Sequence, residues 1–210
     1  MNYKWTNFNN FGFLTKKFTS EELIPIQNEV DSIKENFDKG IKYNHVLIGH
    51  LKHEYQLQKS LKYAEQLILP LVIDYDKSSN YLETFSFLTK DVSIILDKFW
   101  VNFQTKTEFN PVHNHKGIMS FVIWLKIPYL IEDENNYFDT GIEENHKRNG
   151  QFSLFYTNSL GQIGSHLIPA DKNFEGTIAL FPSKMCHCVY PFYTSDDYRI
   201  SVSGNFKLKI

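Results

Sequence analysis

Three of the eight histidines stand where they could bind one metal ion. His113 and His115 are two residues apart in FNPVHNHKG, directly before the most apolar segment of the chain. In an extended strand such residues share one face about 6.5 Å apart, so both imidazoles could reach a metal through bonds of about 2.1 Å. His187 follows 72 residues after His115, at the end of GTIALFPSKMCH. The other five histidines lie in polar or helical contexts and are expected to be ordinary.

A segment near the C-terminus, YRISVSGN, carries a second group of polar side chains. Arg199, Ser201, Ser203 and Asn205 alternate with apolar residues, so they occupy one face of an expected strand. Arg199 comes twelve residues after His187 and is one of two arginines among 22 basic residues. A guanidinium can bind a carboxylate through two parallel hydrogen bonds, which lysine cannot do. Together with the histidines, this strand is expected to turn its polar face into a barrel.

These residues resemble the pattern of the Fe(II)- and 2-oxoglutarate-dependent oxygenases: His-x-Asp, a distal His, and Arg-x-Ser about ten to thirteen residues later. The resemblance covers about Trp100 to Phe206. It is nearest to short members from bacterial and bacteriophage genomes and more distant to prolyl 4-hydroxylases. The family is built on a double-stranded β-helix, a jelly roll related to the cupins, with helices packed on it.

The resemblance implies roles for single residues. His113 and His187 would bind Fe(II), Arg199 would bind the distal carboxylate of the cosubstrate 2-oxoglutarate, and Ser201 would support it. Asn102, on the preceding strand, is a candidate to hydrogen-bond the cosubstrate or a bound water. O₂ would convert 2-oxoglutarate to succinate and CO₂ while a substrate C–H bond is hydroxylated.

One position departs from the family pattern, because His115 stands where the family has aspartate. His115 could itself bind iron, which gives a three-His site like those of some cupins. It could instead begin a His-x-Gly motif with Gly117 and leave one position to water or halide, or a carboxylate such as Asp171 or one in 132–144 could complete the site. The spacing favours the first arrangement. Three neutral imidazoles leave Fe(II) with a charge of +2, so that dianionic 2-oxoglutarate gives a neutral complex.

The elements that position these residues begin with an expected helix. Thr19 and Glu22 form a capping-box pattern. Apolar residues at three- and four-residue spacing over 23–37 predict a helix that ends near Gly40. Pro25, early in this pattern, is expected to delay the start of the helix by a turn.

The rest of the chain is expected to complete a single domain over 1–210, in which 1–90 is mainly helical and 91–210 forms the double-stranded β-helix. A second apolar stripe over 57–75 predicts a helix that Pro70 kinks or interrupts. Short β-rich segments then follow at 92–104, 118–129, 151–157, 162–169, 176–182, 187–192 and 198–208. Such spacing without intervening helices indicates an antiparallel sandwich or barrel. The polar stretch 132–150 is expected to be a surface loop, with a lid as one interpretation.

Composition excludes several classes of protein. The 210 residues are 42% hydrophobic, which rules out a disordered chain, and no apolar run approaches 18 residues, so no membrane span or secretory signal is expected. A net charge of −2 makes nucleic acid an unexpected partner. Cys186 and Cys188 are too close in sequence for an unstrained disulfide, which indicates reduced thiols and a cytoplasmic location, phage-encoded chains included.

The sequence therefore predicts an enzyme, a dioxygenase that needs Fe(II), 2-oxoglutarate and O₂. It would hydroxylate a C–H bond of a small-molecule or peptidyl substrate, with a prolyl or other amino-acid residue as one candidate. Two other classes stay open: a cupin-like metalloenzyme, such as a three-His dioxygenase or isomerase without 2-oxoglutarate, and a jelly-roll binding module without catalysis. The Arg199-x-Ser201 pair favours the oxygenase.

Overall fold

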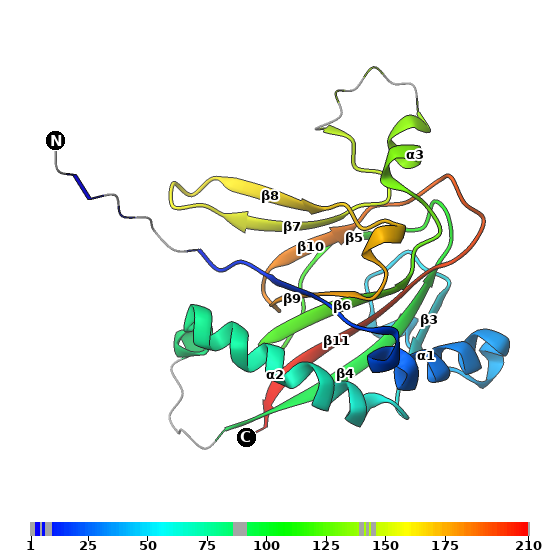
Figure 1. Cartoon of the computed structure of the whole chain (residues 1–210), viewed down its shortest axis with the longest axis horizontal. Coiled ribbons are helices and arrows are strands. Elements are labelled where there is room, and N and C mark those ends of the chain that lie inside the picture. The colour runs from blue at the N-terminus through cyan, green and yellow to red at the C-terminus, as the bar shows by residue number, and fades with distance from the viewer. Residues whose placement is uncertain are drawn as a thin grey trace.

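Two antiparallel sheets form the body of the protein (Figure 1), whose computed structural model describes residues 3–4, 6, 10–85, 92–138, 141, 143 and 146–209. The large sheet contains, in spatial order, β1 (Leu14–Lys17), β9 (Thr177–Pro182), β6 (Met119–Lys126), β11 (Arg199–Lys209), β4 (Ser93–Gln104), β3 (His53–Gln56) and β2 (Ile41–Lys42). The small sheet contains β5 (Asn110–His113), β10 (Cys186–Val189), β7 (Phe152–Thr157) and β8 (Ile163–Ile168). The predicted jelly-roll fold class is confirmed, and each of the seven predicted β-rich segments contains a strand.

Helix α1 (Ser20–Glu35) begins as the sequence predicts. Thr19 Oγ1 accepts a hydrogen bond from Glu22 N, and the Glu22 carboxylate accepts one from Thr19 N, so the capping box is complete. The expected delay at Pro25 is wrong, because the helix starts at Ser20 and contains this proline. It also ends at Glu35, before a separate 3-10 turn over Phe37–Lys39.

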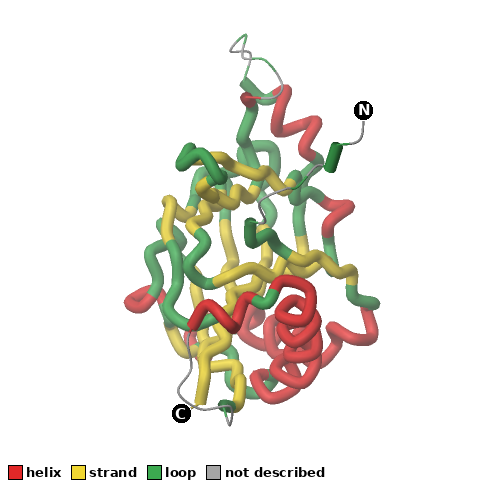
Figure 2. The backbone as a smooth tube through the Cα atoms, turned by 90° about the vertical axis from the view of Figure 1, so that its left-hand side faces the viewer, coloured by secondary structure: helices red, strands yellow, loops and turns green. Residues whose placement is uncertain are grey.

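Helix α2 (Leu61–Ser79) passes through Pro70 without a break, so the expected interruption is wrong. The helix stops where the apolar pattern stops, since Asn80 adopts a left-handed conformation with φ of 52°. In Figure 2 the two long helices lie together on one side of the strands. Among the described residues, no helix is both long and apolar enough to cross a lipid bilayer.

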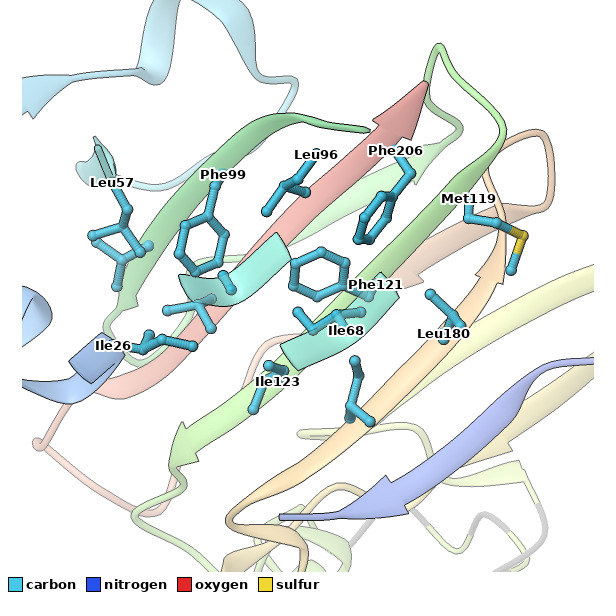
Figure 3. Packing of buried hydrophobic residues seen from close by; sticks show 14 of the residues in the cluster. Ile26, Leu57, Ile68, Leu96, Phe99, Met119, Phe121, Ile123, Leu180 and Phe206 are labelled. Atoms are coloured by element: carbon cyan, nitrogen blue, oxygen red, sulfur yellow. The ribbon is translucent and has the colours of Figure 1, made fainter. Parts of the chain in front are cut away.

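The long helices cover the outer face of the large sheet. Their apolar residues, such as Ile26 and Ile68, pack against Phe99, Phe121 and Phe206 of the sheet, as Figure 3 shows. A smaller apolar cluster lies between the two sheets. The outer face is therefore sealed by α1 and α2, and the inner face is left for a site.

Besides its helices, the segment 1–90 contains short strands that the sequence did not predict. It contains β1, β2 and β3, which extend both edges of the large sheet by pairing with β9 and β4. These strands have only four, two and four residues, too few for an alternating pattern to stand out. Their strand conformation comes from pairing with an existing edge.

The stretch 132–150, expected to be a surface loop, begins with a short helix, α3 (Ile131–Asn136). Glu134 on this helix is buried, and its carboxylate accepts hydrogen bonds from the backbone N–H groups of Tyr193 and Thr194. This contact fixes the start of the stretch. Residues 139–140, 142 and 144–145 lie outside the described part, so the interpretation as a lid is not tested there.

Candidate metal and cosubstrate site

The three predicted histidines lie together at the inner face of the small sheet. His113 on β5 and His187 on β10 are direct cross-strand partners, which places their side chains next to each other. His115 follows β5, where its backbone N–H donates to Ser183 O. The ring centroids are 4.3 Å apart for His113 and His187, and 4.9 Å apart for each of the other pairs. One potential ligand atom from each residue lies within 4.8 Å of the others.

Hydrogen bonds and burial prepare these imidazoles for a metal. The Nδ1–H of His113 donates to Pro111 O at 2.7 Å, and the Nδ1–H of His187 donates to Met185 O at 3.1 Å. These bonds leave both Nε2 atoms unprotonated. Burial is the main cause of a lowered pKa at all three rings, with the pKa of His115 lowered to about 3, so the rings are neutral near pH 7. Three neutral imidazoles this close are a donor set that suits a divalent transition metal such as Fe(II).

The structure bears on the alternatives for the middle ligand. Gly117 has φ of +106°, and a Cβ there would lie 2.4 Å from Phe206 O. The backbone therefore requires glycine at this position for steric reasons, and the His-x-Gly pattern needs no metal-binding role to explain it. Asp171 accepts hydrogen bonds from Asn173 N and Ile131 N and caps a 3-10 turn. The Glu134 carboxylate accepts hydrogen bonds from the backbone N–H groups of Tyr193 and Thr194, so it is already engaged away from the histidines. Asp139 and Glu144 lie outside the described residues.

A cavity of about 550 Å³ between the two sheets contains the histidine cluster and reaches Arg199. Arg199 is 2% exposed, and its five N–H groups donate to Gln104 Oε1, Tyr129 Oη, Gly150 O and Tyr190 O over 2.5–3.2 Å. All of these acceptors are neutral. No carboxylate of the described residues pairs with this buried guanidinium, so its charge has no counter-ion within them.

The alternation predicted for β11 places its polar residues inside. Ser201 pairs in register with Asn102 on β4, both line the cavity, and Asn102 Nδ2 donates to Ser201 Oγ at 3.4 Å. Ser203 and Asn205 line the same cavity farther along β11. Ile200, Val202 and Phe206 point into the core beneath the helices. All six predicted site residues therefore border one cavity.

Comparison with known proteins decides the family. Residues 98–205 match a sequence model of a family described as "Putative 2OG-Fe(II) oxygenase", slightly more than half of the chain and including all six predicted site residues. The chain belongs to this family. The oxygenase therefore uses Fe(II), 2-oxoglutarate and O₂, and neither alternative class is favoured. A search of curated protein sequences finds no match.

Solved structures support the fold of this oxygenase. A prolyl-4-hydroxylase of Pseudomonas putida superimposes with a TM-score of 0.55 at 12% identity, covering 94% of this chain and 93% of the other. AviO1 of Streptomyces viridochromogenes gives 0.56 at 7% identity, covering 94% and 90%. The α-ketoglutarate-dependent carbocyclase SnoK from nogalamycin biosynthesis gives 0.51 at 12% identity, covering 93% and 79%. At such low identity the similarity concerns the fold alone.

The remaining histidines and both cysteines of the oxygenase are not part of the histidine triad. Within the described residues, the histidine triad is the one group of His, Cys, Asp or Glu ligands placed to share an ion. Both cysteines are free, as expected, and Cys188 is buried. Phe152 and Phe181 pack on the ring of His187, with centroids 5.6 and 4.9 Å away, so the triad has an apolar wall.

Sequence reasoning missed two residues that hold Arg199 in place and one residue in the wall of the cavity. Gln104 faces Arg199 in the β4–β11 register, and Tyr129 accepts a hydrogen bond from the same guanidinium. The polar Gln104 at the end of an apolar strand was a usable signal for the first, whereas Tyr129 follows the predicted strand without one. Glu54 on β3 is 1% exposed and lines the cavity, and nothing in the sequence around it indicates burial.

Proposed function

We propose that this oxygenase is a hydroxylase in which His113, His115 and His187 hold Fe(II) and Arg199 holds the distal carboxylate of 2-oxoglutarate. The supporting observation is the pairing, in one cavity, of a neutral imidazole triad with a buried guanidinium that lacks a counter-ion. A dianion that spans both groups would satisfy the metal and the guanidinium together.

Bound Fe(II) and 2-oxoglutarate supply the oxidation chemistry, in which O₂ yields succinate, CO₂ and a hydroxylated substrate carbon. The protein would hold the metal ion and the cosubstrate and orient them toward the substrate. The carbonyl acceptors Pro111 O and Met185 O fix the Nδ1–H tautomer of two ligands and direct their Nε2 atoms to the metal. Three neutral ligands keep the full +2 charge on the ion, which strengthens its attraction for a dianionic cosubstrate.

Arg199 is held in place before the cosubstrate arrives. Gln104 accepts from Nε and Nη2, and Tyr129 accepts from Nη1, so the fork is oriented in advance. Because all five N–H groups donate to protein acceptors, a carboxylate that binds here takes the place of some of these acceptors, of which Tyr190 O is the most distant at 3.2 Å. Ser201 and Asn102 line the same stretch of cavity. Because Ser201 Oγ accepts from Asn102 Nδ2, the Ser201 hydroxyl proton and the second N–H of Asn102 Nδ2 can each be donated to a cosubstrate oxygen or a water. Trp124 and Phe152 restrict water around the reacting centre.

The substrate is proposed to be a small molecule or a peptidyl group, with a prolyl or other amino-acid residue included. The fold shared with a prolyl-4-hydroxylase and with the carbocyclase SnoK supports both classes. The free thiols of Cys186 and Cys188 support a reducing, cytoplasmic setting.

Anaerobic titration of the protein with Fe(II) and then 2-oxoglutarate tests this function. We expect a weak visible charge-transfer band that needs both components, and on admission of O₂ slow formation of succinate without any substrate. His187→Ala should abolish tight iron binding, and His166→Ala, at an exposed histidine on β8, is the matched control. Absence of the band together with absence of thermal stabilisation by 2-oxoglutarate would refute the proposal.

A further inference from the structure

Glu54 is a buried carboxylate in the wall of the cavity with half of its hydrogen-bonding capacity unused. Its Oε2 accepts a hydrogen bond from Asn44 Nδ2 at 3.2 Å, whereas its Oε1 is buried and accepts none within the described residues. No lysine or arginine of that part of the chain forms an ion pair with it. A buried carboxylate without a cation is costly unless a ligand completes it.

Two side-chain amide oxygens beside Glu54 are likewise buried without a hydrogen-bond donor among the described residues. Asn102 faces Glu54 in the β3–β4 register, and Asn110 on β5 also lines the cavity. The Oδ1 atoms of both are buried and accept no hydrogen bond within the described chain. A Cβ placed on Gly49 would lie 2.5 Å from Asn110 Oδ1 and 3.0 Å from Glu54 Oε1, so these two oxygens flank one glycine. The cluster thus presents three acceptor oxygens and one negative charge.

The chemistry of this acceptor cluster selects its ligand. A primary ammonium group has three N–H donors and one positive charge, whereas a hydroxyl group has a single donor and carboxylates and phosphates are repelled. A divalent metal ion would find one carboxylate only, which is little for a hard cation. Burial, with a smaller effect of Glu108, raises the pKa of Glu54 to about 7, and a bound cation would keep the carboxylate ionised.

We propose that Glu54, Asn102 and Asn110 bind a primary ammonium group of the substrate. The proposal rests on the proposed function, because the ammonium anchors in the same cavity as the histidine triad and so positions the carbon to be hydroxylated. Val46, Leu47 and Ile48 form an apolar wall of this cavity, suited to the aliphatic part of an amine. The substrate class is therefore an aliphatic amine, either a free amino compound or the basic end of a peptide.

The test uses the Fe(II)- and 2-oxoglutarate-loaded protein without oxygen, in a buffer free of primary amines. Calorimetric titrations compare n-butylammonium with 1-butanol and with butyrate. We expect n-butylammonium to bind at least about tenfold more tightly than 1-butanol, because a charge-assisted hydrogen bond contributes more than a neutral one, and butyrate not to bind. Equal binding of the ammonium and the alcohol overturns the proposal, as does displacement of n-butylammonium by millimolar Ca²⁺.

Variants assign the preference to the cluster. In Glu54→Gln, the preference for n-butylammonium over 1-butanol should fall to less than about threefold. Glu54→Asp keeps the carboxylate and should keep the preference for n-butylammonium over 1-butanol. Gly49→Ala, which places a methyl group between Glu54 Oε1 and Asn110 Oδ1, should weaken binding of n-butylammonium by about tenfold and serves if Glu54→Gln does not fold. A full preference in Glu54→Gln, or undiminished binding in Gly49→Ala, overturns the proposal.

Two controls separate this inference from the proposed function. Glu108→Gln changes a neighbouring buried carboxylate that accepts from the N–H groups of Lys52 and Thr105, so the ammonium preference should stay within about twofold. Succinate formation by the wild-type protein without any amine is scored separately. A visible band or succinate formation without an ammonium preference refutes only the ammonium site, whereas absence of both the band and thermal stabilisation by 2-oxoglutarate refutes the hydroxylase.

Discussion

Replacing Arg199 with lysine tests the cosubstrate anchor while keeping the positive charge. Arg199 uses five N–H groups on four acceptors, and a lysine ammonium offers three. At least two of the five hydrogen bonds are therefore lost in the free protein, which costs about 1–3 kcal/mol of unfolding free energy at roughly 0.5–1.5 kcal/mol each. Urea unfolding of the metal-free protein measures this loss.

The loss of cosubstrate affinity is a separate quantity. A lysine can replace a two-point carboxylate contact with a single point, which removes one charge-assisted hydrogen bond of about 1.5–3 kcal/mol. The Kd of 2-oxoglutarate should therefore rise about 10- to 150-fold. Iron binding should be unchanged, because Arg199 lies outside the histidine cluster.

The assay is an anaerobic 2-oxoglutarate titration of the Fe(II)-loaded variant, followed by the visible band, with iron affinity measured beforehand. Arg148→Lys is the matched control, since Arg148 is the other arginine of the chain and is not among the cavity-lining residues. Its Kd for 2-oxoglutarate should change by less than about twofold. An unchanged Kd in a folded Arg199→Lys variant, or an equal loss in Arg148→Lys, would contradict the role assigned to Arg199.

Three further variants address the metal site and the cavity. His115→Ala should weaken Co(II) binding by at least about 100-fold in a competition titration, and intact binding would exclude the three-His site. Gly117→Ala should lower the unfolding free energy by about 2 kcal/mol or more, because its positive φ and its approach to Phe206 O both exclude a side chain; an unchanged urea midpoint would refute this reading. Since the pKa of Glu54 is higher in the folded protein (about 7) than in the unfolded chain (about 4.5), its contribution destabilises the fold increasingly as pH rises from 4.5 through 7. Cavity water screens part of this, so wild type should lose about 1–2 kcal/mol relative to Glu54→Gln between pH 5.5 and 8 in urea unfolding, and parallel pH profiles would contradict the raised pKa.

The parts of the fold that the sequence predicts are those where local pattern and tertiary context agree. The alternation in β11 places Arg199 and Ser201 inward because one face of that strand is covered by α2 and the other lines the cavity. The His113-x-His115 spacing predicts convergence because β5 is extended there and pairs with β10. In both cases residues close in sequence decide the outcome.

The parts that the sequence does not predict depend on distant neighbours. β3 has four residues, and its Glu54 becomes buried only because β4, the segment 44–51 and β5 surround it. A glutamate in such a short polar segment reads as exposed. Pro25 and Pro70 likewise suggest breaks, yet α1 and α2 continue through them because packing on the sheet stabilises both helices. Tertiary contacts override the local signal at each of these positions.

The placement of charge in the cavity argues for function over stability. Arg199 and Glu54 are opposite charges, both buried, on strands that flank β4 and are separated by two strand spacings, roughly 10 Å. β4 keeps them apart with amide side chains, Gln104 accepting from Arg199 and Asn102 facing Glu54. Selection for stability alone would pair the two charges or replace both with apolar residues. An uncompensated cation and an uncompensated anion that border the same cavity, together with a neutral histidine triad, instead match the anionic cosubstrate and the cationic substrate proposed above.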